Sequence, residues 1–302
     1  MEILSNNKIF IQIASYRDPE LLPTINNCIE NSDNPENLVF AICWQKDENE
    51  TLDTYINDPR FKIICIHYSH AKGACWARNK LQQLYDNEEY TLQLDSHHRF
   101  IKGWDTTLKQ MYANLVEKGY KPLITAYAPS YNPEKDPEER VHIPWKIDFR
   151  EITVDKQVLF IPSNMNGFEN LEEPIKATFY SAHFAFTSGA FVKEVPHDPE
   201  LYFTGEEMNI TIRAFTHGYD LFHPHIVVIW HEYTRKNRQK HWDDDKEWWK
   251  KDLHSKQHYI DFFKNLTFSN KEYKYGLGEK RTLEEYKTYA NVDLLEIAKN
   301  DI

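Results

Sequence analysis

The sequence predicts an α/β fold in which a mostly parallel central sheet is flanked by helices. Apolar runs of strand length alternate with segments of helical period through the first 128 residues, and parallel strands need crossovers of this kind. Polar or Gly-containing turns separate the segments. Because sheets of this class bind ligands beyond the carboxyl ends of their strands, the residues that follow each strand are the first candidates for chemistry.

The first part of the chain predicts strands and helices largely in alternation. Apolar runs indicate buried strands at residues 8–14, 38–44, 61–68, 90–94 and 122–128. Helical periodicity and turn residues indicate helices at residues 20–31, 75–85 and 104–117. This order favours right-handed crossovers between neighbouring parallel strands.

The second part is less regular. Residues 130–146 are rich in Pro and charge and predict a long loop or lid. We expect a helix at 208–217 closed by Gly218, and strands at 158–162, 177–186, 221–224 and 226–230. From residue 236 the chain becomes charged and Trp-rich. We therefore expect a main α/β domain over residues 1–235 and a helical extension packed on it over residues 236–302.

Composition excludes several classes of protein. The net charge of −11 supplies no basic field for nucleic acid, and no segment approaches the roughly 20 apolar residues of a membrane span. The first residues lack the basic and apolar regions of a signal peptide. The cysteines have no CxxC spacing, and we expect them to be buried thiols in a cytosolic protein: Cys28, Cys43, Cys65 and Cys75.

The segment from Leu92 to Phe100 carries the strongest chemical signal. An apolar strand ends at Asp95, and His97 follows after one small residue. A carboxylate oxygen and an imidazole nitrogen at a strand end can bind one Mn²⁺ or Mg²⁺ ion beside a diphosphate. His231, which ends another apolar strand, is the expected third ligand. The alternative is a capped strand end with a hydrogen-bonded histidine.

Other polar residues complete a predicted site at the same rim. The planar guanidinium of arginine suits phosphate, so the predicted donor-binding residues are Ser15, Arg17, Arg78, Asp95 and Ser96. Two adjacent glutamates precede a helix; one can cap it, and the other, predicted to be Glu206, can act in the cleft on a sugar hydroxyl. No G-x-G-x-x-G or Walker pattern follows the first strand, which disfavours dehydrogenases and P-loop proteins.

Three motifs together resemble one enzyme family. Phe10–Asp18, Gly73–Arg78 and Gln93–Phe100 are similar to the cytosolic N-acetylglucosaminyltransferases that modify hydroxyproline in a ubiquitin-ligase subunit. Tyr275–Gly278 and the Arg-Thr-Leu run at 281–283 are also similar, so the resemblance covers about residues 8–293. It implies a GT-A fold, a UDP-sugar donor, a divalent cation and retention of anomeric configuration.

A more distant resemblance links the chain to polypeptide N-acetylgalactosaminyltransferases. The order of Ser188–Phe191, Phe203–Glu207 and the Trp-His pair at 230–231 is similar to the order of motifs in those enzymes. It implies Asp95, His97 and His231 as Mn²⁺ ligands and Glu206 in the position that contacts the sugar. Phe203, Thr204 and Glu207 depart from that family's Trp-Gly-Gly-Glu-Asn segment, which leaves the donor sugar and the acceptor open.

Together these features predict a metal-dependent retaining glycosyltransferase. We expect transfer of N-acetylglucosamine from UDP-GlcNAc to a hydroxyl of hydroxyproline, Ser, Thr or a glycan, with front-face attack by the acceptor. The alternatives are a metal-dependent nucleotidyltransferase or diphosphohydrolase on the same type of sheet, and a non-catalytic sugar-binding module. The first would release diphosphate or a nucleoside monophosphate, and the second would bind UDP without turnover.

Overall fold

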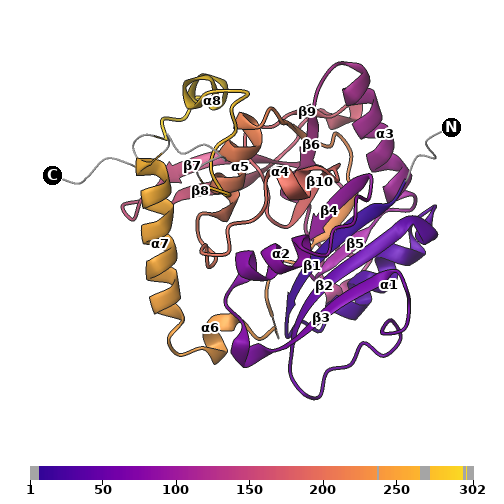
Figure 1. Cartoon of the computed structure of the whole chain (residues 1–302). Helices are drawn as coiled ribbons and strands as arrows, with labels where there is room; N and C mark the ends of the chain where they lie inside the picture. The colour runs from indigo at the N-terminus through magenta and orange to yellow at the C-terminus, as the bar shows by residue number, and fades with distance from the viewer. Residues whose placement is uncertain (1–6, 237, 266–272, 295–296, 298–302) are drawn as a thin grey trace.

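An eight-stranded mixed sheet forms the centre of the computed structural model, which describes residues 7–236, 238–265, 273–294 and 297. The strand order is β3-β2-β1-β4-β10-β6-β11-β9 (Figure 1). The parallel half contains β1 (Ile9–Tyr16), β2 (Leu38–Lys46), β3 (Phe61–His67) and β4 (Tyr90–Leu94). The other half contains β6 (Pro122–Thr125), β9 (Ile175–Lys176), β10 (Phe184–Ser188) and β11 (Asp220–His223).

The direction of the strands changes at β10. This strand runs antiparallel to both β4 and β6, β6 and β11 are parallel, and β9 closes the edge antiparallel to β11. The carboxyl ends of β1 and β4 therefore meet at one rim, because these two strands are parallel neighbours. The predicted α/β class with a mostly parallel sheet is confirmed.

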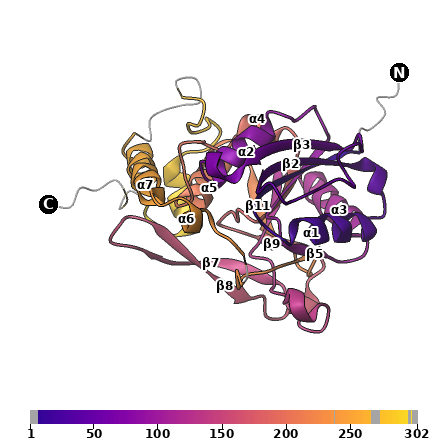
Figure 2. The ribbon, with the colours of Figure 1, turned by 90° about the horizontal axis from the view of Figure 1, so that it is seen from below.

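Helices cover both faces of the sheet, as Figure 2 shows. On one face α1 (Leu21–Glu30) and α3 (Trp104–Glu117) pack against the odd-numbered residues of β1 in a common core. On the other face α2 (Ala74–Gln82) and α4 (Phe191–Glu194) pack against Phe10 and the alternate residues of β2. This arrangement follows from the period of two in a strand, which sends successive side chains to opposite faces.

A separate two-stranded ribbon lies beside the rim. In it β5 (His98–Phe100) pairs antiparallel with β12 (Ile229–His231). The register sets His231 opposite His98. The ribbon therefore brings a late segment of the chain next to the end of β4.

The remaining elements lie around the second half of the sheet. The hairpin of β7 (Trp145–Ile152) and β8 (Val158–Asn164) forms its own two-stranded sheet. Helix α5 (Glu206–Thr216) shares a second core with α7 (Trp248–Lys264) and α8 (Leu283–Ala290), while α6 (His241–Asp244) precedes α7. Short 3-10 helices span η1 (Pro35–Asn37), η2 (Tyr68–His70), η3 (Pro133–Lys135) and η4 (Phe168–Asn170).

Most of the predicted elements are confirmed, and α3 has the predicted bounds. The strand predicted over 177–186 is wrong for its first part, because residues 177–183 are not strand and Phe179 and Tyr180 are buried by the cores around α5. The strand predicted over 226–230 is shorter and begins at Ile229. Cys65 is exposed on the edge strand β3, contrary to the predicted burial; the other cysteines are buried.

The two predicted domains extend beyond the described residues. The following residues of the two predicted domains lie outside the described part of the chain: 1–6, 237, 266–272, 295–296 and 298–302. Within the described part, α7 contributes Tyr259, Phe262 and Phe263 to the second core, whereas Trp249 is 52% exposed. Among the described helices, none is long and apolar enough to cross a bilayer.

Candidate metal and donor site

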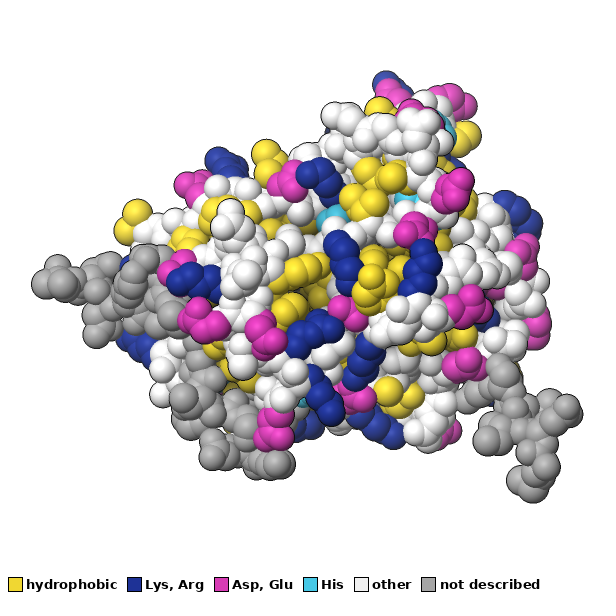
Figure 3. Space-filling model, turned by 90° about the horizontal axis from the view of Figure 1, so that it is seen from above, with side chains coloured by type: hydrophobic (Ala, Val, Ile, Leu, Met, Phe, Trp, Pro, Cys, Tyr) yellow, Lys and Arg dark blue, Asp and Glu magenta, His cyan; other side chains and the backbone are white. Residues whose placement is uncertain are grey.

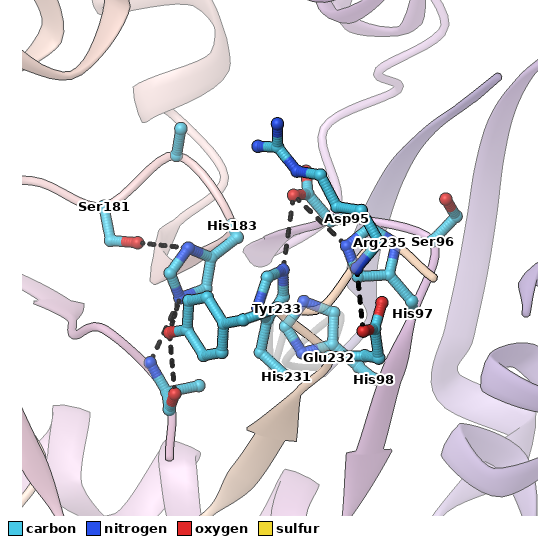
Figure 4. Close-up of polar contacts among 12 residues, drawn as sticks. Asp95, Ser96, His97, His98, Ser181, His183, His231, Glu232, Tyr233 and Arg235 are labelled. Carbon is cyan, nitrogen blue, oxygen red and sulfur yellow. Dashed lines mark hydrogen bonds and ion pairs between the residues drawn. The ribbon is translucent and has the colours of Figure 1, made fainter. Parts of the chain in front are cut away.

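Asp95, His97 and His231 converge at the rim of the sheet. Their ligand atoms all lie within 4.8 Å of one another. Oδ2 of Asp95 is 3.5 Å from Nε2 of His231 and 3.8 Å from Nε2 of His97. Figure 4 shows both imidazoles directed at this carboxylate. Ligand bonds of about 2.1 Å place two donors on one ion roughly 3 to 4 Å apart, so the spacing fits a single divalent cation.

His231 has the surroundings of a metal ligand. Its backbone N–H donates to the Pro129 carbonyl at 3.0 Å, and its own carbonyl accepts from Tyr131 N–H at 3.2 Å. The ring of His183 stacks on it with centroids 4.2 Å apart. Neither ring nitrogen of His231 has a hydrogen-bond partner among the described residues, although both are buried. Burial holds the pKa of His231 well below its usual range, which gives the neutral imidazole that a metal requires.

Asp18 orients His97 from behind. Nδ1 of His97 donates to Oδ2 of Asp18 at 2.8 Å, and the Ser96 hydroxyl donates to the same oxygen at 2.7 Å. Arg238 approaches that oxygen at 3.1 Å and pairs with Glu232 at 2.9 Å. Burial alone would raise the pKa of Asp18, but the hydrogen bond from His97 and the charge of Arg238 lower it. An ionised carboxylate on the far nitrogen of a ligating histidine fixes its tautomer.

Arg78 connects Asp95 to Glu206 beneath the site. Its Nη2 donates to Oδ1 of Asp95 at 2.7 Å, and its Nη1 donates to both carboxylate oxygens of Glu206. Nε2 of His197 lies 2.9 Å from Oε1 of Glu206. Burial would raise the pKa of Glu206, yet Arg78 and His197 lower it, so this buried carboxylate is ionised and paired.

Glu207 points to a different environment. It accepts hydrogen bonds from the Tyr127 hydroxyl at 2.9 Å and from the Ala182 backbone at 3.0 Å. Desolvation raises its pKa to about 7 despite these bonds. Neither Glu206 nor Glu207 is among the residues that line the cavity beside the three candidate ligands, so Glu206 reaches the site through Arg78.

A cavity of about 420 Å³ opens above the three candidate ligands. Four basic residues line it together with Asp18 and Asp95: Arg78, Arg235, Arg238 and Lys240. The guanidinium of Arg235 lies 5.7 Å from the ring centroids of both Phe203 and Trp242. A cavity with several cations and aromatic walls suits a diphosphate joined to a base or a sugar.

Gly73 allows the cavity wall to form. It has φ +111°, and a Cβ atom there would lie 2.5 Å from the carbonyl oxygen of Tyr202. The next residue, Ala74, donates its backbone N–H to that carbonyl at 3.0 Å. Only glycine fits this close approach without strain.

The predicted donor-binding residues divide into two groups. Arg78, Asp95 and Ser96 line the cavity, whereas Ser15 and Arg17 are not among its lining residues. Ser15 is fully buried in β1. Arg17, at φ +45°, forms ion pairs with Asp47 at 3.0 Å and Asp244 at 2.9 Å. A role of Ser15 and Arg17 in donor binding stays a prediction.

Several cavity residues were not predicted from the sequence. Asp18, Arg235 and Arg238 contact or line the site. Asp18 follows the carboxyl end of β1, and this position at the ligand-binding rim is the sequence feature that could have identified it. Residues 235 and 238 belong to an irregular segment after β12. Such a segment has no helical or strand periodicity from which the direction of its side chains could be predicted.

The fold and the site together define a glycosyltransferase of the GT-A type. The family model described as Glycosyltransferase (GlcNAc) matches residues 8–58 and 53–296, and the chain belongs to this family. No curated protein sequence matches the chain. The family favours glycosyl transfer over the nucleotidyltransferase and sugar-binding alternatives.

A solved structure supports the fold. The chain is similar to GalNAc-T7 in its crystal structure with UDP, GalNAc and Mn²⁺, with a TM-score of 0.58 and 15% sequence identity. The similarity covers 98% of this chain and 57% of that chain, so this chain spans little more than half the length of the relative. The predicted GT-A fold is confirmed, while specificity for hydroxyproline stays a prediction.

Proposed function

We propose that this chain transfers N-acetylglucosamine from UDP-GlcNAc to a hydroxyl acceptor, with Mn²⁺ or Mg²⁺ held by Asp95, His97 and His231. The observation that carries the proposal is the convergence of these three side chains beside a cavity lined by four basic residues, in a chain of this family. When bound, the cation would neutralise charge on the diphosphate leaving group.

The chain's own residues would bind and orient the donor. Arg235 and Lys240 offer positive charge to the diphosphate, while Arg238 is paired with Asp18 and Glu232. Arg78 holds the Asp95 carboxylate from below. Phe203 and Trp242 offer flat surfaces to the base or the sugar. Glu206 is a positioning residue in this proposal, because its contacts are with Arg78 and His197.

The site supports front-face attack by the acceptor hydroxyl. Among the described residues that line the cavity, the carboxylates are those of Asp18 and Asp95, and both are engaged with His97, Arg238 or Arg78. Neither is placed to form a glycosyl ester and also keep these partners. The donor's phosphate oxygen would then accept the proton of the attacking hydroxyl, with retention of configuration.

The division of the chain and its location are also proposed. Residues 1–235 would form the catalytic GT-A domain, and residues 236–302 an extension whose 238–242 part lines the donor cavity. A cytosolic location is supported by the four free cysteines.

A panel of nucleotide sugars tests this function. The protein is incubated with UDP-GlcNAc, UDP-GalNAc, UDP-glucose and GDP-mannose, with Mn²⁺ or with chelator, and with hydroxyproline, Ser and Thr peptides or a glycan as acceptors. We expect UDP release that is fastest with UDP-GlcNAc and abolished by the chelator. Faster turnover of another donor would refute the sugar assignment, and release of diphosphate instead of UDP would refute glycosyl transfer.

A further inference from the structure

A second hollow, separate from the donor cavity, lies between α2 and α7, which face each other in Figure 1. Its volume is about 900 Å³. Four lysines line it against a single glutamate: Lys72, Lys80, Lys250 and Lys251 against Glu200. We call this hollow the lysine groove.

The charge of its lining is opposite in sign to the net charge of the chain. The chain has a net charge of −11, and on the face shown in Figure 3 basic and acidic side chains are interspersed. Several exposed lysines pair with acids, as Lys118 does with Glu173. In the lysine groove, Nζ of Lys80 lies 5.0 Å and Nζ of Lys72 lies 6.0 Å from the ring centroid of Trp76. Among the described residues, no ion pair joins Lys72 or Lys80 to a carboxylate, whereas Lys250 pairs with Glu247 and Lys251 pairs with Asp245 at 2.6 Å.

The walls of the groove suit an extended chain. Trp76 and Lys80 lie four residues apart on α2, with Gln83 at its C-terminal cap, and Lys250 and His254 lie four residues apart on α7. Such intervals place side chains on one face of a helix. Two facing helix surfaces leave room for an extended segment between them. The amide of Gln83 and the hydroxyl of Ser69 can hydrogen-bond the backbone of a peptide.

The groove meets the donor cavity at a shared wall. Tyr202 lines both, and the chain passes from Ala71 in the groove to Gly73 in the cavity. The Tyr202 hydroxyl also contacts Nδ1 of His241 at 2.5 Å, and Nε2 of His241 lies 3.1 Å from the Ala71 carbonyl. A segment lying in the groove would therefore reach the edge of the donor cavity.

We propose that the lysine groove binds an acidic polypeptide segment of the acceptor and so delivers a nearby hydroxyl to the donor cavity. This inference rests on the proposed function. A peptide is favoured over an anionic saccharide because the ammonium groups of Lys72 and Lys80 lie near the Trp76 ring on which a sugar would stack. The ammonium groups of Lys72 and Lys80, which have no acidic partner among the described residues, are complementary to carboxylates.

Fluorescence anisotropy with a labelled oligoglutamate peptide tests the proposal. The wild-type protein, a Lys80→Glu/Lys250→Glu variant and a Lys118→Glu/Lys280→Glu control are titrated at low ionic strength. The control makes the same change of charge outside the groove. We expect the groove variant to bind about tenfold more weakly than the control, and high salt to remove the difference. Melting temperatures verify that both variants fold.

Two competitors and one parallel assay complete the test. An oligoglutamine peptide should fail to displace the label, and a sulfated oligosaccharide should displace it less well than unlabelled oligoglutamate. Equal affinities of the groove and control variants, or stronger displacement by the saccharide, would overturn the proposal. UDP release from UDP-GlcNAc is measured on the same wild-type sample: release without peptide binding refutes the groove alone, and peptide binding without release refutes the proposed function.

Discussion

Nδ1 of His97 donates a hydrogen bond to Asp18 at 2.8 Å, and this leaves Nε2 of the same ring facing Asp95 at 3.8 Å. The two residues lie at the ends of parallel neighbouring strands, β1 and β4. The Asp18 carboxylate thus determines which ring nitrogen of His97 a cation would meet. Asp18 is not itself a candidate ligand, yet it holds the candidate ligand His97 in place.

Replacement of Asp18 should weaken metal binding. In Asp18→Asn the carboxylate that fixes the His97 tautomer is lost, so the Mn²⁺ concentration for half-maximal UDP release should rise about 10–100-fold. A Mn²⁺ titration of UDP release measures it. Asp47→Asn is the control, because Asp47 pairs with Arg17 and does not line the cavity. An unchanged Mn²⁺ requirement would show that Asp18 does not act through His97.

Removal of Glu206 should destabilise the protein as well as slow it. In Glu206→Ala the buried guanidinium of Arg78 loses a partner, at a cost of about 3–5 kcal/mol in the free energy of unfolding. Denaturant unfolding measures the change. Glu200→Ala is the control: its pair with His254 is exposed and should matter by less than about 1 kcal/mol. Equal effects of the two changes would contradict the role of Glu206 as the partner that positions Arg78.

Gly73 should tolerate no side chain. Gly73→Ala places a Cβ atom 2.5 Å from the Tyr202 carbonyl oxygen at φ +111°, so we expect a loss of roughly 1–3 kcal/mol and reduced UDP release. Gly119→Ala is a matched control, since Gly119 has φ +84° but nothing within 4 Å of its Cβ position. The loss of stability at position 73 beyond that at position 119 measures the cost of the close approach to Tyr202. Equal losses at both positions would mean that backbone strain alone is responsible.

Glu207 should make stability depend on pH. Desolvation raises its pKa in the folded protein from the ordinary value of a glutamate to about 7. A group with a raised pKa stabilises the fold below its unfolded pKa, and this contribution is lost as pH rises through the folded pKa. Thermal unfolding between pH 4.5 and pH 8 should therefore show wild-type stability falling relative to Glu207→Gln. The glutamine amide can still accept from Ala182 and donate to Tyr127. Parallel curves would place the pKa of Glu207 near its ordinary value.

The sequence was sufficient where local pattern decides the structure. Apolar runs located β1, β2, β3 and β4, and the end of β4 located Asp95 and His97. The strand predicted at 177–186 is wrong for residues 177–183, because aromatic residues there are buried by packing against α5. An apolar run alone does not distinguish burial within a strand from burial of a loop against a helix.

Long-range contacts limited the prediction of the site. His231 was predicted as the third ligand, and its approach depends on the pairing of β12 with β5, a three-residue strand too short to show a period. Arg238 was missed because it meets Asp18 across 220 positions in the sequence. The ion pair of Arg78 with Glu206 was likewise invisible, although both residues had been predicted separately.

The most direct test of the metal site is UDP release from UDP-GlcNAc as a function of Mn²⁺ concentration, for the wild-type protein and His231→Asn. The His231 ring is buried and packs against His183, so the melting temperature of the variant is measured to verify that it still folds. We predict that the variant loses about 100-fold or more of the Mn²⁺-dependent rate. A folded variant that releases UDP at the wild-type rate, with the wild-type Mn²⁺ dependence, would contradict the assignment of His231 as a metal ligand.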